Sequence, residues 1–331
     1  MREPSPAART MALSSEVTAP SLAAGLRSRV RPVDGIDYDE LGLFHENAEE
    51  WGLVLDAPPT VRRAAATLPD GRAISGLLWG DGPPSLVLLH GGAQNAHTYD
   101  TLALAMGGAL AAFDLPGHGH SDGPSAAGID PAAHADDIAV AISALCAPRV
   151  TLVGMSLGGL VAIELADRHP HLVERLVLID ITPGVTREKS SHITDFINGP
   201  PGFASFDELL ERTIAFNPTR SVSSLRRGIL HNAVQLDDGT WVWRWARHRT
   251  LGEGRVSAPP ASDLWQAIAR IEVPLMLVRG MAAGSVVDDA DEARLLELQP
   301  GARIERVEGA GHSVQGDQPL VLAEVLEDFR R

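Results

Sequence analysis

Residues 148–168 read Pro-Arg-Val-Thr-Leu-Val-Gly-Met-Ser-Leu-Gly-Gly-Leu-Val-Ala-Ile-Glu-Leu-Ala-Asp-Arg. The apolar, partly β-branched run Val150–Val153 predicts a buried strand. Apolar residues at helical spacing over Leu157–Arg168 predict a helix. Between them lies Gly154-Met155-Ser156-Leu157-Gly158, a G-x-S-x-G pattern at a strand-to-helix turn, which is the context that gives this pattern meaning. The stretch therefore predicts a serine, Ser156, exposed at a sharp turn.

The Ser156 turn requires small residues on both sides. A turn this sharp holds the serine in a strained backbone conformation, and side chains two positions before and after it would collide. Gly154 and Gly158 remove that collision. The N-terminus of the following helix would lie beneath the hydroxyl and stabilise negative charge there. The alternative, a glycine-rich turn that happens to hold a serine, is disfavoured by the flanking strand and helix.

The composition indicates which classes of partner to expect. The chain has 331 residues, 44% of them apolar, which is enough for one large domain with an inserted lid. A formal net charge of −15 argues against nucleic acid or an anionic membrane surface as partner. No apolar run approaches the length of a transmembrane helix. We expect a small-molecule substrate, and the sequence leaves open whether the chain forms a homodimer.

The single cysteine, Cys146, bears on redox environment and chemistry. One cysteine excludes a disulfide framework within the chain, which fits the reducing cytoplasm. Cys146 has no nearby histidine in the sequence, so we expect a small apolar residue and not a nucleophile. We therefore predict a cytoplasmic protein.

Periodicity and composition divide the chain into four regions. Residues 1–30 lack a periodic apolar face, which predicts a disordered tail, and residues 31–60 form an extension with a short helix. Strands alternate with helices over 61–183 and 266–331, which predicts an α/β core with a mostly parallel sheet and helices on both faces. Residues 184–265 have short helical patterns and no clear strands, which predicts an inserted helical cap.

Aromatic residues alternate near the end of the predicted cap. We expect a short helix over Trp241–Arg249, which contains Trp241, Trp243 and Trp245. The favoured interpretation is that the tryptophans form the core of the cap. The alternative is an aromatic wall for an apolar substrate, in which Trp243 contacts the substrate.

Two glycine turns at strand ends complete the chemistry around Ser156. Residues 87–93, Val-Leu-Leu-His-Gly-Gly-Ala, run from a strand into a turn in which the N–H of Gly92 can point at a substrate oxygen. Together with the N–H of Leu157 it would form an oxyanion hole. His97 follows this turn and is a candidate for substrate contact. His312, in a glycine loop after the last strand, can reach the serine and act as general base and then general acid.

The chain resembles the α/β-hydrolase fold family over residues 61–331. The resemblance rests on four motifs in this order: His90-Gly91-Gly92, Asp114-Leu115-Pro116-Gly117-His118-Gly119-His120-Ser121, Gly154-Met155-Ser156-Leu157-Gly158 and Gly309-Ala310-Gly311-His312. It implies an eight-stranded, mainly parallel sheet, a helical cap after the sixth strand, and a Ser–acid–His triad that works without a cofactor. The motifs are specific for the fold and poorly specific for the substrate.

The triad acid is where this sequence departs from the usual family pattern. The family commonly has an aspartate after the seventh strand, where this chain has Ala283. Some members place the acid after the sixth strand, a place that Asp180 occupies here. We predict Asp180 as the acid, with Asp288 as the main alternative and Asp289 or a dyad without an acid as the remainder. If it is not catalytic, Asp180 would cap the following turn through its side chain.

The leading hypothesis is a serine hydrolase that cleaves an ester, lactone, thioester or activated C–C bond of a small apolar molecule. A non-catalytic ligand receptor and a cofactor-free oxygenase or perhydrolase are alternatives, because the resemblance implies that the fold hosts these activities too. The histidines are too scattered in the sequence for a metal site, and no phosphate-binding loop of the P-loop type is present. We therefore expect neither a metal nor a cofactor.

Overall fold

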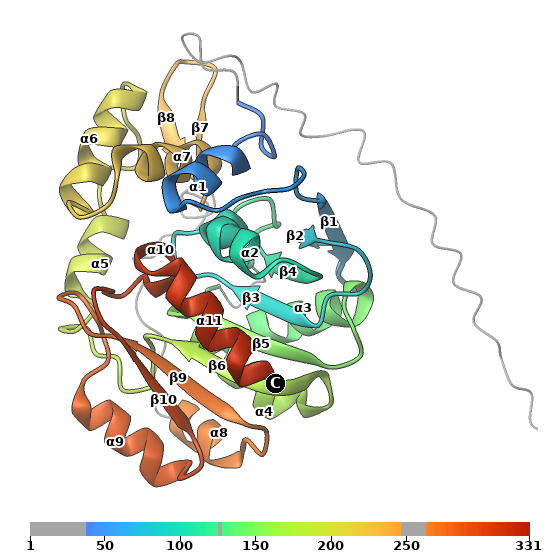
Figure 1. Ribbon diagram of the computed structural model, residues 1–331. Helices are drawn as coiled ribbons and strands as arrows, with labels where there is room; N and C mark the ends of the chain where they lie inside the picture. The colour runs from blue at the N-terminus through green and yellow to red at the C-terminus, as the bar shows by residue number, and fades with distance from the viewer. Residues whose placement is uncertain (1–37, 125–127, 246–262) are drawn as a thin grey trace, which may run out of the picture.

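The computed structural model describes residues 38–124, 128–245 and 263–331, so the predicted tail 1–30 lies outside it. A central sheet has the strand order β1-β2-β4-β3-β5-β6-β9-β10 (Figure 1). Its strands are β1 Val61–Thr67, β2 Ala73–Trp79, β3 Leu86–Leu89, β4 Leu110–Phe113, β5 Val150–Met155, β6 Val173–Ile179, β9 Leu275–Gly280 and β10 Arg303–Val307. Neighbours are parallel except β1–β2 and β2–β4. The predicted eight-stranded, mostly parallel sheet is confirmed.

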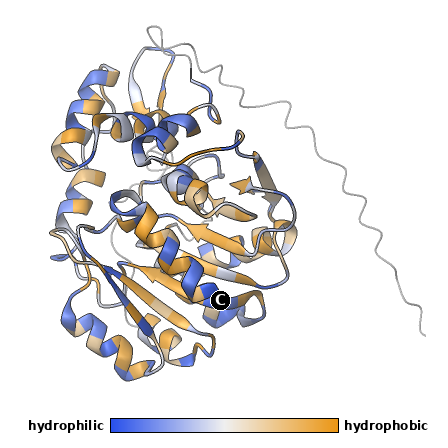
Figure 2. Cartoon of the chain, in the orientation of Figure 1, coloured by the Kyte–Doolittle hydropathy of each residue, from blue (hydrophilic) through white to orange (hydrophobic). Residues whose placement is uncertain are grey.

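Helices cover both faces of the sheet, and each face has its own core. One core contains Val87 and Leu89 of β3, and the other contains Leu86 and Leu88, as the two-residue period of a strand requires. The central strands, which are buried on both faces, are mostly apolar, as Figure 2 shows. The first core is covered by α3 Pro131–Leu145, α4 Leu157–Arg168, α8 Leu264–Arg270 and α9 Asp289–Leu298, and the second by α2 Asp100–Met106 and α11 Pro319–Arg330.

The extension contributes a helix, as expected. Helix α1, Phe44–Trp51, packs on α2, and its Phe44 ring lies 4.7 Å from the Trp79 ring, centroid to centroid. Two short helical turns flank the carboxyl edge of the sheet: the 3₁₀ helix η1, Ala96–Tyr99, and α10, Val314–Asp317. None of the helices within the described ranges combines the length and the apolarity needed to span a membrane.

Between β6 and α8 the chain leaves the sheet and forms an inserted segment. It contains α5 Ser191–Ile197, α6 Phe206–Phe216, α7 Val222–Asn232, β7 Ala233–Gln235 and β8 Trp241–Trp243. In Figure 1 this segment lies beyond one end of the strands, next to α1 and α10. We call it the inserted segment below.

The prediction of a helix over Trp241–Arg249 is wrong, and so is the expectation of no strands in this region. Trp241–Trp243 is a strand that pairs with β7 around a turn at Gly239, where φ is +88°. The alternation of tryptophans has the period of a strand, and Asp238-Gly239 is a hairpin signal. Residues 246–249 lie outside the described part of the chain. All three tryptophans are buried in one cluster, as the favoured interpretation predicts.

The turn at Ser156 has the strained geometry that its sequence indicates. Ser156 has φ +51°, a region that L-residues with a side chain rarely adopt. A Cβ atom on Gly154 would lie 2.3 Å from the Gly158 carbonyl oxygen, and one on Gly158 would lie 2.3 Å from the Leu89 carbonyl oxygen. The glycines therefore let β5, β3 and the start of α4 approach each other at backbone contact distance.

We expect Gly158→Ala to lower the free energy of unfolding by about 3 kcal/mol or more, because the obstructing atoms are backbone and cannot rotate away. Thermal unfolding followed by circular dichroism measures this. Gly228→Ala is the matched control, since a Cβ at this helical position meets nothing within 4 Å. The control should be neutral or stabilising by up to about 1 kcal/mol. Equal melting temperatures for the two variants would contradict the packing argument.

Candidate active site

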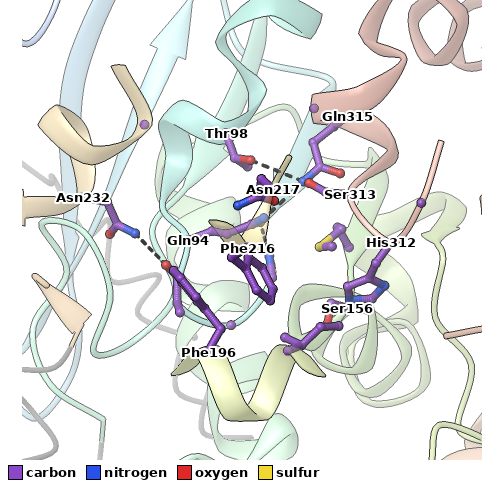
Figure 3. Close-up of a pocket in the computed structure, with 18 of the residues that line it drawn as sticks. Gln94, Thr98, Ser156, Phe196, Phe216, Asn217, Asn232, His312, Ser313 and Gln315 are labelled. Carbon is purple, nitrogen blue, oxygen red and sulfur yellow. Dashed lines mark hydrogen bonds between the residues drawn. The ribbon is translucent and has the colours of Figure 1, made fainter. Parts of the chain in front are cut away.

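Three polar side chains follow strand ends at the same edge of the sheet. Ser156 follows β5, Asp180 follows β6, and His312 lies in the loop after β10. Ser156 and His312 line a cavity of about 790 Å³ between the sheet edge and the inserted segment. Figure 3 shows the Ser156 side chain pointing toward the His312 ring. The carboxyl ends of neighbouring parallel strands meet at one edge, which is why residues 156 positions apart in the chain reach one cavity.

Asp180 is fully buried and holds the His312 ring. Its Oδ2 lies 2.9 Å from Nδ1 of His312, a normal hydrogen-bond distance. The same carboxylate accepts bonds from the N–H of Gly280 at 3.0 Å, the N–H of Val286 at 3.0 Å and the hydroxyl of Ser285 at 2.6 Å. A carboxylate only accepts, so Nδ1 carries the hydrogen and the Nε2 lone pair faces the serine side.

The two alternative acids, Asp288 and Asp289, make contacts with groups other than His312. Asp288 is the N-cap of α9, where its side chain accepts from the N–H of Asp291 at 2.9 Å and pairs with Lys189 at 2.8 Å. Asp289 is 96% exposed at its side chain and pairs with Arg279. The structure therefore brings Asp180 to His312 and places both alternatives elsewhere.

The glycine turn after β3 leaves one backbone donor free. The N–H of Gly91 donates to Oε1 of Gln94 at 3.0 Å, and that of Ala93 donates to Nε2 of His118 at 3.1 Å. Burial lowers the pKa of His118 to about 3, so this ring is neutral at pH 7 and its Nε2 accepts. Among the hydrogen bonds of the described residues, neither the Gly92 N–H nor the Leu157 N–H donates to a protein acceptor.

Backbone strain is concentrated at these same loops. Within the described ranges, the non-glycine residues with positive φ are Ala93 at +63°, Ser156 at +51° and Asp180 at +44°. Ala93 lies in the glycine turn, Ser156 in the strand-to-helix turn, and Asp180 directly after β6. Strained conformations persist only where the surroundings over-determine them, and they gather at functional sites.

The two candidate substrate contacts behave differently from each other. His97 lines the cavity, but its Nδ1 lies 2.9 Å from Asp100 and its Nε2 lies 3.2 Å from Glu40, so both ring nitrogens are already engaged. Trp243 is 6% exposed and also lines the cavity, so it belongs both to the aromatic cluster and to the cavity wall.

His97, Asp100 and His231 bring ligand-type atoms within 4.8 Å of one another, which is a grouping that the scattered sequence positions did not indicate. The two imidazole rings are stacked, with centroids 3.7 Å apart and an angle of 8° between their planes. An imidazole nitrogen binds a metal through the lone pair in its ring plane. Two parallel rings therefore cannot both point lone pairs at one ion, and the group does not fit a metal as it stands.

Several residues that shape the surroundings of the site were not predicted from the sequence. Ser285 lies two residues after the position where the family acid was sought, and its hydroxyl binds Asp180 instead. Glu40, from the extension, bonds to Arg63 and His97 and had no sequence signal beyond a generally acidic segment. Cys146 lies outside the cavity lining, and burial raises its pKa to about 12, which agrees with an inert thiol.

Comparison with known proteins agrees with this geometry. The model of the alpha/beta hydrolase family matches residues 86–325, well over half of the chain. The chain belongs to the α/β-hydrolase family. The esterase Rv0045c of Mycobacterium tuberculosis is 41% identical over 297 residues, covering 87% of this chain and 94% of that protein. Its crystal structure superimposes with a TM-score of 0.75 at 39% identity, covering 88% of this chain and 97% of that one.

A second relative extends the range of reactions in this family. The 2-(acetamidomethylene)succinate hydrolase of Mesorhizobium japonicum is 28% identical over 255 residues, covering 74% of this chain and 87% of that protein. The crystal structure of E-2-(acetamidomethylene)succinate hydrolase has a TM-score of 0.71 at 24% identity, covering 82% of this chain and 99% of that one, which shows the shared fold. This α/β-hydrolase is an enzyme of the hydrolase class.

The charge of His97 makes the stability of this hydrolase depend on pH. Burial alone would lower the pKa of His97, but the charges of Asp100 and the hydrogen bonds to Asp100 and Glu40 raise it from 6.5 to about 9. A raised pKa means that the protonated ring stabilises the folded state. The contribution is complete below pH 6.5, declines through the range between 6.5 and about 9, and is absent above it.

We expect the wild-type enzyme to lose about 3 kcal/mol of folding free energy between pH 6.5 and 9.5 through this ring, and His97→Gln to lack that component. Urea unfolding at several pH values measures it, and the readout is the difference between the two pH profiles. The exposed His171→Gln is the control and should follow the wild type. Parallel profiles for wild type and His97→Gln would refute the assignment of charge to His97.

Proposed function

We propose that this α/β-hydrolase is a serine esterase in which Ser156, His312 and Asp180 form the catalytic triad. The observation that carries the proposal is the 2.9 Å contact between buried Asp180 and the His312 ring, with Ser156 on the other side of that ring in a shared cavity. The similarity to a mycobacterial esterase supports the ester as the bond that is cleaved.

Each group has one task in the proposed reaction. Nε2 of His312 takes the hydroxyl proton as the Ser156 oxygen attacks the ester carbonyl carbon. The N–H groups of Gly92 and Leu157 hold the resulting oxyanion. The imidazolium then gives its proton to the leaving alcohol, and the C–O bond breaks to leave an acyl-serine. Water, deprotonated by the same ring, then attacks the acyl carbon. The bond between this carbon and the Ser156 oxygen breaks, the serine oxygen takes the proton from His312, and the acid is released.

The inserted segment, with the predicted bounds 184–265, would act as the cap of this site over a core of 61–183 and 266–331. Its Phe196 and Phe216 rings stack with centroids 4.2 Å apart and line the cavity together with Trp243. These apolar walls favour a small substrate with an apolar acyl group. The net charge of −15 and the single cysteine support a cytoplasmic enzyme without nucleic acid or membrane partners.

Ser156→Ala should abolish covalent labelling by a fluorophosphonate and reduce hydrolysis of p-nitrophenyl esters to the background rate. The fold should persist, because the hydroxyl is not part of the core. Mass spectrometry of the labelled protein and a coupled rate assay measure the two effects. Labelling that survives in the variant would remove Ser156 as nucleophile. Wild-type labelling without turnover of any ester in the panel would favour the ligand-receptor alternative.

Asp180→Asn should lower kcat by about 10⁴, because the amide cannot hold the imidazole in the required tautomer and no longer stabilises the imidazolium. Asp288→Asn is the matched control: it makes the same chemical change, and asparagine also serves as an N-cap. Steady-state kinetics on p-nitrophenyl butyrate compare the two. If Asp288→Asn costs as much as Asp180→Asn, the assignment of the acid is wrong.

A further inference from the structure

The wall of the catalytic cavity changes character from one side to the other. One side, the apolar arm, is lined by Leu160, Ile181, Val185 and Ile193, which pack together against the core below α4. The other side, the polar arm, is lined by Asn47, Thr98, Asp100, Thr101, His231 and Gln315. An ester has two halves, so a cavity with two chemically different sides can hold them in one orientation.

The polar arm includes residues of η1 and α2. Thr98 and Thr101 are three positions apart on these two consecutive helical segments, and both line the cavity. Gln315 of α10 faces Thr98 at 3.3 Å, and Asn47 of α1 donates to Thr101 at 2.9 Å. Figure 3 shows Thr98 and Gln315 turned toward each other, away from Ser156.

Several buried polar atoms of this arm have no partner among the described residues. They are Oδ1 of Asn47, Oδ1 of Asp100, Nε2 of His231, Oγ of Ser313 and Oε1 of Gln315. Gln315 is 1% exposed, Asp100 2% and His231 4%. Buried polar atoms without a partner are costly. A hydroxyl group of an occupant, which both donates and accepts, can satisfy those whose side chain turns toward the cavity, as the terminal amide of Gln315 can. The lining residues of the apolar arm contribute no such atom.

Gln315 is held loosely enough to turn toward a ligand. Its Nε2 makes two long contacts, 3.3 Å to Thr98 and 3.4 Å to Gln94, both near the limit of a hydrogen bond. Rotation of the terminal amide exchanges these weak contacts for bonds to an occupant of the arm. Ser313 is the next residue after His312 and Gln315 is the third, so this arm begins beside the ring that must protonate the leaving alcohol.

Helix α1 builds the outer wall of the polar arm, although it lies outside the residues that the family model matches. It supplies Asn47 and Trp51 to the cavity. Arg227 of α7 forms ion pairs with Glu46, at 3.6 Å, and with Glu50, which fasten the extension to the inserted segment. Helix α1 is therefore a wall of the polar arm that lies outside the matched part of the family.

We propose that the polar arm binds the hydroxyl groups of a hydroxylated alcohol, so that the preferred substrates are esters of an apolar acyl chain with a polyol such as glycerol or a sugar. The proposal rests on the proposed esterase function. In that reaction His312 protonates the leaving alcohol, so the alcohol half of the ester must lie next to His312, where this arm begins. The acyl chain then lies in the apolar arm.

The test compares 1-butyrylglycerol with propyl butyrate, which share the acyl group and the three-carbon alcohol skeleton and differ by two hydroxyls. We expect kcat/KM of the wild-type enzyme to be at least about tenfold higher for the glycerol ester. Gln315→Leu and Asn47→Leu, on two different elements, should each bring the ratio of the two kcat/KM values close to one. Gln235→Leu, the same change at an exposed site of β7, should keep the wild-type ratio.

The two proposals fail in different ways. A wild-type ratio below about twofold overturns the polyol inference, and so does a ratio that survives in both arm variants. Hydrolysis of propyl butyrate by Ser156→Ala at the wild-type rate would instead overturn the esterase mechanism. Melting temperatures of each variant identify a folding failure, and the substrate ratio, measured on one sample, does not depend on the folded fraction.

Discussion

The buried carboxylate of Asp180 is the constraint on which the site depends. A fully buried charge is tolerated only when its lone pairs are satisfied, and here four donors do so. The donors come from β9, from the loop after β9 and from the loop after β10. One side chain at the end of β6 therefore holds two segments from 100 to 132 positions further along the chain, the end of β9 with its loop and the loop after β10. The orientation of His312 follows from these hydrogen bonds.

The loop after β9 is complementary to the buried Asp180 at the end of β6. The family that the chain resembles commonly has an aspartate in this loop, where this chain has Ala283. The loop instead supplies Ser285 and Val286 as hydrogen-bond donors to Asp180. A donor-bearing loop and a buried acceptor are complementary, whereas an aspartate in both places would put two negative charges in one buried site.

Much of the sheet, and the meeting of Ser156, Asp180 and His312 at one sheet edge, could be predicted from the sequence because both depend on local patterns. The turn at Ser156, the glycine turn after β3 and the histidine loop each have a short-range signature, and the order of motifs gives the topology. The prediction of a helix over Trp241–Arg249 fails because it follows the short helical patterns around this segment and neglects the two-residue alternation of the tryptophans. The contacts of Glu40 and His97 could not be read at all, since they join the extension to the core through pairs that only the folded chain creates.

The ion pair between Glu50 and Arg227 has a consequence for the order in which the molecule forms. These residues are 177 positions apart in the chain. As the chain emerges from the ribosome, α1 appears first but has no partner in the inserted segment until most of the sheet has been made. A contact between residues that are distant in the sequence requires closing a long loop, which costs conformational entropy, so such contacts tend to form late. Helix α1 can thus pack on α2 early, whereas its contact with the inserted segment forms late. The complete cavity belongs only to the finished protein.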